Sequence, residues 1–178
     1  MFILKSKEFL AAIVGGMLSL LGSSLAIWLQ QRYQLKERKH FVAKFIIDQA
    51  AYLKSLAEHI ENHHQQTGEI WFEYTEPIKI ACDAVNRNIE SLALIEEDNS
   101  RRGVRAYFSN IYYMSQRANF WQTRFYNQLN ISNSNANSAA IEQERADAQA
   151  AKIEQSKCVV ELKRLSLGFD DLKKTLKA

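Results

Sequence analysis

The segment FLAAIVGGMLSLLGSSLAIWL occupies residues 9–29, and its 21 residues include no charged side chain. As a helix that rises about 1.5 Å per residue it spans about 31 Å, which matches the roughly 30 Å hydrocarbon core of a bilayer. A cleaved signal peptide has a shorter apolar core, of roughly 7–15 residues, followed by a small-residue cleavage site. The segment therefore predicts a single retained transmembrane helix, with residues 1–8 as a short tail before it.

Basic residues on the two flanks of this segment predict its orientation. Lys5, Lys7 and the terminal amine precede it, and a larger basic group follows it: Arg32, Lys36, Arg38, Lys39 and Lys44. Because the more basic flank stays in the cytoplasm, we expect an inner (cytoplasmic) membrane protein with its N-terminus outside and a cytoplasmic C-terminal domain. The first four of the following group are also placed to contact anionic lipid headgroups.

Small residues recur along the apolar segment at spacings of three and four, which puts them on one helix face: Ala12, Gly15, Ser19, Gly22 and Ala26. Such a face lets a second helix pack closely. A chain with one span must find that helix in another chain, so we expect a homo-oligomer. An alternative function is an oligomeric pore or membrane-perturbing effector of a bacterial defence or toxin system, in which Ser19, Ser23 and Ser24 face a water path.

Residues 30–178 carry four stripes of apolar residues with the spacing of amphipathic helices. No Pro or Gly occurs between Gly22 and Gly68, so the transmembrane helix is expected to continue into the first of them. The predicted fold class is all-α, an N-terminal single transmembrane helix that continues into an antiparallel four-helix bundle formed by residues 30–178.

Turn-forming residues predict where these helices break. We expect breaks at residues 65–68, at 98–103 and in the Asn-rich run 130–138. A second helix is expected to begin at Thr75, with Pro77 in its first turn. Gly168 is expected to end or bend the last helix.

The composition excludes several classes of protein. With 47% hydrophobic and 24% charged residues and a net charge of +3, the chain is not disordered. One Pro and six Gly argue against collagen-like and β-sandwich folds. Cys82 and Cys158 are too few for a disulfide framework or a four-thiolate zinc site. Because Cys158 lies on an apolar stripe, we expect a buried structural thiol and not a nucleophile.

Four histidines, all before residue 65, raise the question of a metal site. Glu37 with His40, and Glu61 with His64, have the Glu-x-x-His spacing of di-iron carboxylate bundles. These motifs are 24 residues apart on one expected helix, about 36 Å, so they do not share an ion. His59 and His63 share a helix face that offers only a weak surface site. We expect no cofactor, no metal and no catalytic residue; a metal-binding bundle enzyme is the second alternative function.

Charge and aromatic residues are distributed unevenly along the bundle. Residues 99–141 contain no acidic residue, whereas residues 58–98 contain ten acidic and two basic ones. Neighbouring antiparallel helices neutralise this difference, so nucleic acid is not an expected partner. Aromatic residues in excess of one stripe predict either a wide packed stripe or a patch that binds another protein: Trp71, Phe72, Tyr74, Tyr113, Phe120 and Tyr126. The sequence thus predicts a membrane-anchored, non-enzymatic interaction and assembly module.

Overall fold

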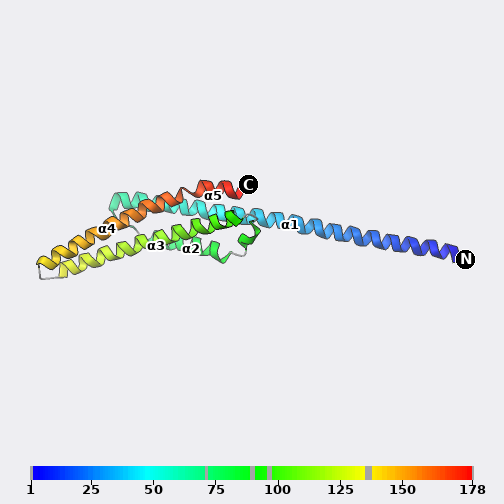
Figure 1. Cartoon of the computed structure of the whole chain (residues 1–178), viewed down its shortest axis with the longest axis horizontal. Coiled ribbons are helices and arrows are strands. Elements are labelled where there is room, and N and C mark those ends of the chain that lie inside the picture. The colour runs from blue at the N-terminus through cyan, green and yellow to red at the C-terminus, as the bar shows by residue number, and fades with distance from the viewer. Residues whose placement is uncertain (1, 71, 89–90, 96–97, 135–137, 178) are drawn as a thin grey trace. The chain divides into compact units, whose positions relative to one another are not determined.

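The computed structural model describes residues 2–70, 72–88, 91–95, 98–134 and 138–177 (Figure 1). Its helices are α1 (Phe2–Thr67), α2 (Phe72–Arg87), α3 (Asp98–Ser134), α4 (Ser138–Ser166) and α5 (Phe169–Lys177), with a 3₁₀ turn at Ser91–Leu94. The described ranges contain no strand, so the all-α prediction is confirmed. The chain divides into two units, Met1–Phe41 and Val42–Ala178.

The first unit is the N-terminal part of α1. Among the described residues, α1 is the one helix long and apolar enough to cross a membrane, judged by its length and composition. None of its apolar window is buried, and large side chains such as Leu18, Leu20 and Leu21 are exposed. The apolar surface of this segment is therefore uncovered by the residues that the structure describes.

The second unit is a four-helix bundle made by residues 42–67 of α1 with α2, α3 and α4, which α5 extends. Lys163 pairs with Glu61 at 2.8 Å and Asp170 with Lys54 at 3.6 Å, so α4 and α5 run antiparallel to α1. Contacts between Ile70 and Gln122, and farther along between Cys82 and Phe108, likewise make α2 and α3 antiparallel. The predicted antiparallel order is confirmed.

Apolar residues at helical spacing from all four helices fill the bundle core. The largest fully buried side chains include Phe108, Ile46, Leu53, Ile60 and Ile78. The hydroxyl of Tyr107 lies 3.4 Å from the carbonyl oxygens of both Ala50 in α1 and Ser166 in α4. One phenol thus joins three helices, and its burial raises the pKa of Tyr107.

The turn between α1 and α2 forms where residues 65–68 predicted a break. Gly68 has a φ of +71°, a left-handed conformation that costs little only for glycine. Its N–H donates to the carbonyl of His64 at 2.8 Å, and the Thr67 hydroxyl donates to the carbonyl of His63 at 2.9 Å. These bonds satisfy carbonyls that the end of α1 would leave open.

Three predicted helix boundaries differ from the structure. Helix α2 begins at Phe72, three residues before Thr75, and Pro77 lies inside it. Helix α3 already begins at Asp98, so the turn expected at 98–103 is wrong. The Asp98 carboxylate binds Arg102 at 2.6 Å and lies near the positive end of the helix dipole, which stabilises this earlier start.

The loop expected at residues 130–138 is also too long, because α3 continues through Ser134. Ser132 is buried, and its hydroxyl donates to the carbonyl of Leu129 at 2.9 Å. Packing against a neighbouring helix therefore outweighs the poor helix propensity of Asn and Ser. Residues 135–137 of the predicted loop lie outside the described residues.

The break predicted at Gly168 is confirmed, since α4 ends at Ser166 and α5 begins at Phe169. The Gly168 N–H donates to the carbonyl of Leu165 at 3.1 Å. A Cβ at Gly168 would lie 3.2 Å from that same oxygen and 3.7 Å from the Tyr107 ring, so a side chain there would crowd the turn.

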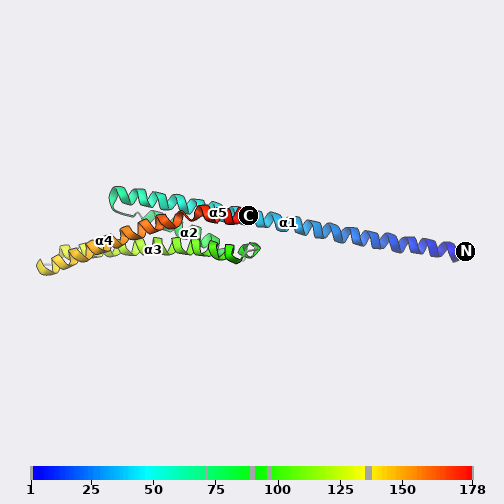
Figure 2. The same ribbon diagram turned by 45° about the horizontal axis from the view of Figure 1, so that its top comes forward.

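The α3–α4 hairpin extends past the turn between α1 and α2, as both views show (Figures 1 and 2). That turn lies beside Gln122 of α3 and Lys152 of α4. We call residues 123–134 and 138–151, which lie beyond these points, the arm. Only small or polar side chains of the described arm residues are fully buried, namely Ser132, Ala148 and Ala151.

Two glycine substitutions are expected to change stability in opposite directions. Gly68→Ala forces a Cβ into the left-handed conformation and should lower the free energy of unfolding by about 1–2 kcal/mol. Gly103→Ala, inside α3 where a Cβ meets no atom within 4 Å, should raise it by about 0.5–1 kcal/mol. Denaturant unfolding of the full chain in detergent, followed by far-UV circular dichroism, measures both. A shift of the two midpoints in the same direction would contradict this account of the turn.

Candidate functional site

The small-residue face of α1 is open along its whole length. Ala12, Gly15, Ser19, Gly22 and Ala26 are all exposed. A Cβ built at Gly15 or Gly22 meets no atom within 4 Å, so none of the described residues packs on this face at these positions. The Ser23 hydroxyl, which the pore alternative needs for a water path, lies 2.9 Å from the carbonyl of Ser19 and 3.0 Å from that of Leu20. That hydroxyl is thus satisfied within its own helix.

The basic group that follows the apolar segment lies on the same helix. The Arg32 guanidinium stands 4.5 Å from the centre of the Trp28 ring. An arginine on the face of an aromatic ring is a cation–π pair, and Trp is enriched at the edge of a bilayer. Lys36 and Arg38 are exposed, whereas Lys39 is partly buried. This arrangement suits the headgroup contact that the sequence predicts.

The predicted aromatic patch is divided among several surfaces. Tyr113 and Phe120 are 59% and 58% exposed and, being seven residues apart, share one face of α3. Tyr74 instead packs against the core, with ring centres 6.5 Å from His59 and 6.2 Å from His63. Trp71 lies outside the described residues, and Phe72 is placed only as the first residue of α2.

Tyr126, the last member of the patch, contacts the loop between α1 and α2. Burial and a hydrogen bond to the Glu69 carboxylate raise the pKa of Tyr126 to about 12. Its hydroxyl therefore donates to Glu69 and helps to hold this loop against α3. The structure thus brings Tyr113 and Phe120 together as exposed rings and gives Tyr126 and Tyr74 intramolecular contacts.

The histidines near the end of α1 do not converge on a metal. Among the described residues, no group of three or more His, Cys, Asp or Glu side chains could hold an ion. The His59 ring binds the Ser55 carbonyl at 2.7 Å, and the His64 ring lies 3.0 Å from the Ser156 hydroxyl. Burial, with Lys152 nearby, lowers the pKa of His64, which favours the neutral form of this ring between α1 and α4.

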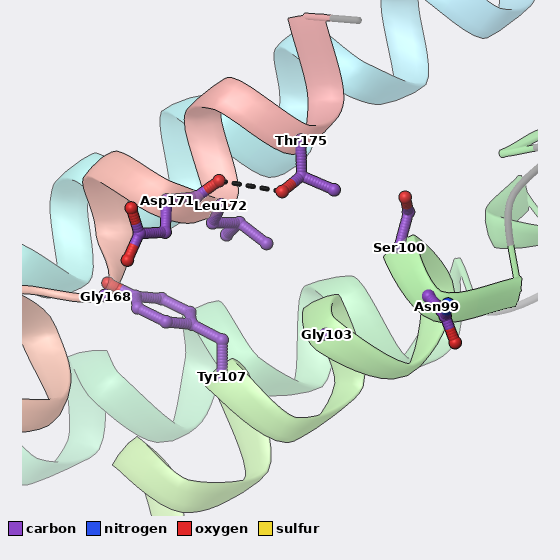
Figure 3. Close-up of a pocket in the computed structure, with 8 residues that line it drawn as sticks. All are labelled: Asn99, Ser100, Gly103, Tyr107, Gly168, Asp171, Leu172 and Thr175. Carbon is purple, nitrogen blue, oxygen red and sulfur yellow. Dashed lines mark hydrogen bonds between the residues drawn. The ribbon is translucent and has the colours of Figure 1, made fainter.

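A cleft lies between the start of α3 and α5 (Figure 3). Tyr107 forms its floor, and Asp171 carries the one carboxylate of its described lining; that carboxylate pairs with Lys174 at 3.4 Å. This lining contains no imidazole or thiol that could serve as a nucleophile or general base. The full lining is Asn99, Ser100, Gly103, Tyr107, Gly168, Asp171, Leu172 and Thr175.

One exposed surface was not anticipated from the sequence. Ile153 and Val160 of α4, and Leu167 in the turn directly after it, are 49%, 66% and 52% exposed, although core residues lie beside them along the chain. Their spacing of seven is the available sequence signal. It is weak, because the same helix also carries the stronger three- and four-residue pattern of its buried face.

Both cysteines are expected to react slowly in the folded chain. Cys82 is buried and its thiol lies 3.4 Å from the carbonyl of Phe108; burial, with Asp83 nearby, raises the pKa of Cys82 to about 12. Burial also raises the pKa of Cys158. A raised pKa lowers the thiolate fraction at pH 8, so Cys82 should react roughly a hundredfold more slowly than free cysteine with a disulfide reagent, and Cys158 should also react more slowly than free cysteine.

Absorbance of the released chromophore, with and without denaturant, measures this rate, and Cys82→Ala and Cys158→Ala variants assign it to each residue. Complete reaction of either thiol in the native chain at the rate of free cysteine would contradict the structural role.

Comparisons with known proteins find no match to this chain. No protein-family model matches the chain, and neither a curated protein nor a solved structure matches it.

Proposed function

We propose that this chain is a single-pass membrane protein that associates with copies of itself and acts as a non-enzymatic interaction and assembly module. The observation that carries the proposal is the unburied apolar length of α1 with its open face of small residues. Exposed Leu, Ile and Val over such a length are unfavourable in water, at about 25 cal/mol per Å² of apolar surface. A bilayer removes that cost.

The flanking charges support an orientation with the bundle in the cytoplasm. Five basic residues follow the apolar segment, and Lys5, Lys7 and the terminal amine precede it. Basic residues favour the cytoplasmic side, and the Arg32–Trp28 stack suits a position at the headgroups. We place the protein in the cytoplasmic membrane with its N-terminus outside.

The exposed face of small residues on α1 supports self-association. In a bilayer, helices associate through close packing and not through the hydrophobic effect. A flat face therefore contributes to stability only when another helix packs on it. No second helix among the described residues is long and apolar enough to span a membrane. A second copy of α1 supplies an equally flat face and is the simplest partner.

Alkaline carbonate extraction of membranes tests the anchor. We expect the full chain to remain in the membrane pellet, because a spanning helix is not released by the loss of charge contacts. A chain that lacks residues 9–29 should be released or soluble. Release of the full chain by carbonate would overturn the proposal at its base.

Substitutions on α1 test the association. Gly15→Leu and Ser19→Leu place branched side chains on the open face and should reduce chemically crosslinked oligomer in detergent roughly fivefold. Ser24→Leu is the matched control, because Ser24 lies about 140° around the helix from Ser19 and makes the same change on the other side. Equal crosslinking of all three variants and the native chain would exclude this face as the contact.

A further inference from the structure

The outer face of α4 carries an apolar row that the fold leaves uncovered. The row consists of Ile153, Val160 and Leu167, at two intervals of seven residues. The interval of seven keeps Ile153 and Val160 on one face of α4, and Leu167 follows in the turn directly after the helix. A shallow recess beside the row is lined by Ile153, Ser156, Lys157, Val160 and Glu161. The row thus has the spacing of a helix that contacts another helix.

Four charges of alternating sign flank this row: Glu154, Lys157, Glu161 and Arg164. Lys157 pairs with Glu154 at 2.6 Å and Arg164 with Glu161 at 2.5 Å, so all four side chains lie along the same side of α4. When the four positions are read from 164 back to 154, the order of negative and positive charges is inverted. A second copy of α4 that runs antiparallel therefore offers an opposite charge at each of these positions.

One two-fold symmetry axis brings both pairs of opposite charges together. A two-fold axis perpendicular to α4 at position 159 places Glu154 opposite Arg164 of a second copy, and Lys157 opposite Glu161. The apolar row is centred on Val160, only one residue, or about 1.5 Å, from that axis. The same operation therefore also brings the two apolar rows together. A parallel pair keeps the signs in the same order and loses this match.

We propose that the outer face of α4 pairs antiparallel with the same face of a second copy, through the apolar row and the two charge pairs. The contact is isologous, as expected for a two-fold pair. One helix against one helix lies below the roughly 1,200 Å² that stable interfaces bury, so the contact should be weak and reversible. It rests on the proposed self-association of the chain but uses residues different from those of the α1 face.

Cysteine crosslinking of the full chain tests both the contact and its direction. In a background with Cys82→Ala and Cys158→Ala, Val160→Cys lies near the axis and should form a disulfide dimer under mild oxidation. Ile153→Cys alone should not, because an antiparallel pair separates its two copies by roughly 20 Å along the helices. A mixture of Ile153→Cys and Leu167→Cys chains should form the mixed dimer. Ile80→Cys, at a similarly exposed position of α2 outside the proposed surfaces, is the control for random collision.

Two results would overturn the proposal. One is a Val160→Cys dimer yield no higher than that of the Ile80→Cys control. The other is self-crosslinking of Ile153→Cys and of Leu167→Cys as strong as their mixed crosslinking, which indicates a parallel pair. The Val160→Cys measurement is repeated with Ser19→Leu in the same chain. A persistent dimer there separates the α4 contact from failure of the α1 face.

Charge reversal gives an independent readout. Lys157→Glu places two carboxylates opposite each other at both symmetric positions and should reduce Val160→Cys crosslinking roughly fivefold at low salt. Adding Glu161→Lys to the same chain restores opposite charges across the axis and should restore crosslinking. A double variant as weak as the single one would exclude the charge pairing.

Discussion

A single amide, the side chain of Gln122, holds the loop between α1 and α2 against α3. Its oxygen accepts the Ile70 N–H at 2.6 Å, and its nitrogen donates to the Ile70 carbonyl at 2.5 Å. Gln155 of α4 donates to the same oxygen at 2.7 Å. The loop after α1 is thus fixed to α3 and α4 together. Without this amide, the N–H and the C=O of the buried Ile70 would lose their hydrogen-bond partners, at a cost of about 1–3 kcal/mol each.

Much of this fold could be predicted from the sequence, because the spacing of apolar residues and the positions of glycines reflect local conformational preferences. The positive φ at Gly68 and the crowded turn at Gly168 are constraints that few other residues satisfy, so these breaks were predictable. The extension of α3 through Ser134 was not, since tertiary packing of Ser132 outweighs local propensity. The exposure of the α1 small-residue face agrees with its spacing, whereas its role in association stays a prediction. The contacts of Tyr74 and Tyr126 could not be predicted, because they depend on which helices become neighbours.

The two proposed contacts differ in the geometry that they impose. Residues 42–67 of α1 run antiparallel to α4, so a two-fold pair through α4 places the two Val42 ends at opposite ends of the pair. Helices that share a bilayer and meet through small residues lie side by side instead. The two contacts therefore join different pairs of copies unless the chain turns between its units. Two different isologous contacts on one chain join more than two copies.

The arm of α3 and α4 has a further consequence for local opening. Large core side chains end near Gln122, and beyond it the described buried residues are as small as Ser132 and Ala148. Separating the two helices of this hairpin therefore exposes little apolar area. Its amide protons should exchange with solvent through a sub-global opening that costs little free energy. The rest of the bundle would keep its protection until global unfolding. The distal hairpin is thus a separate cooperative unit of the folded chain.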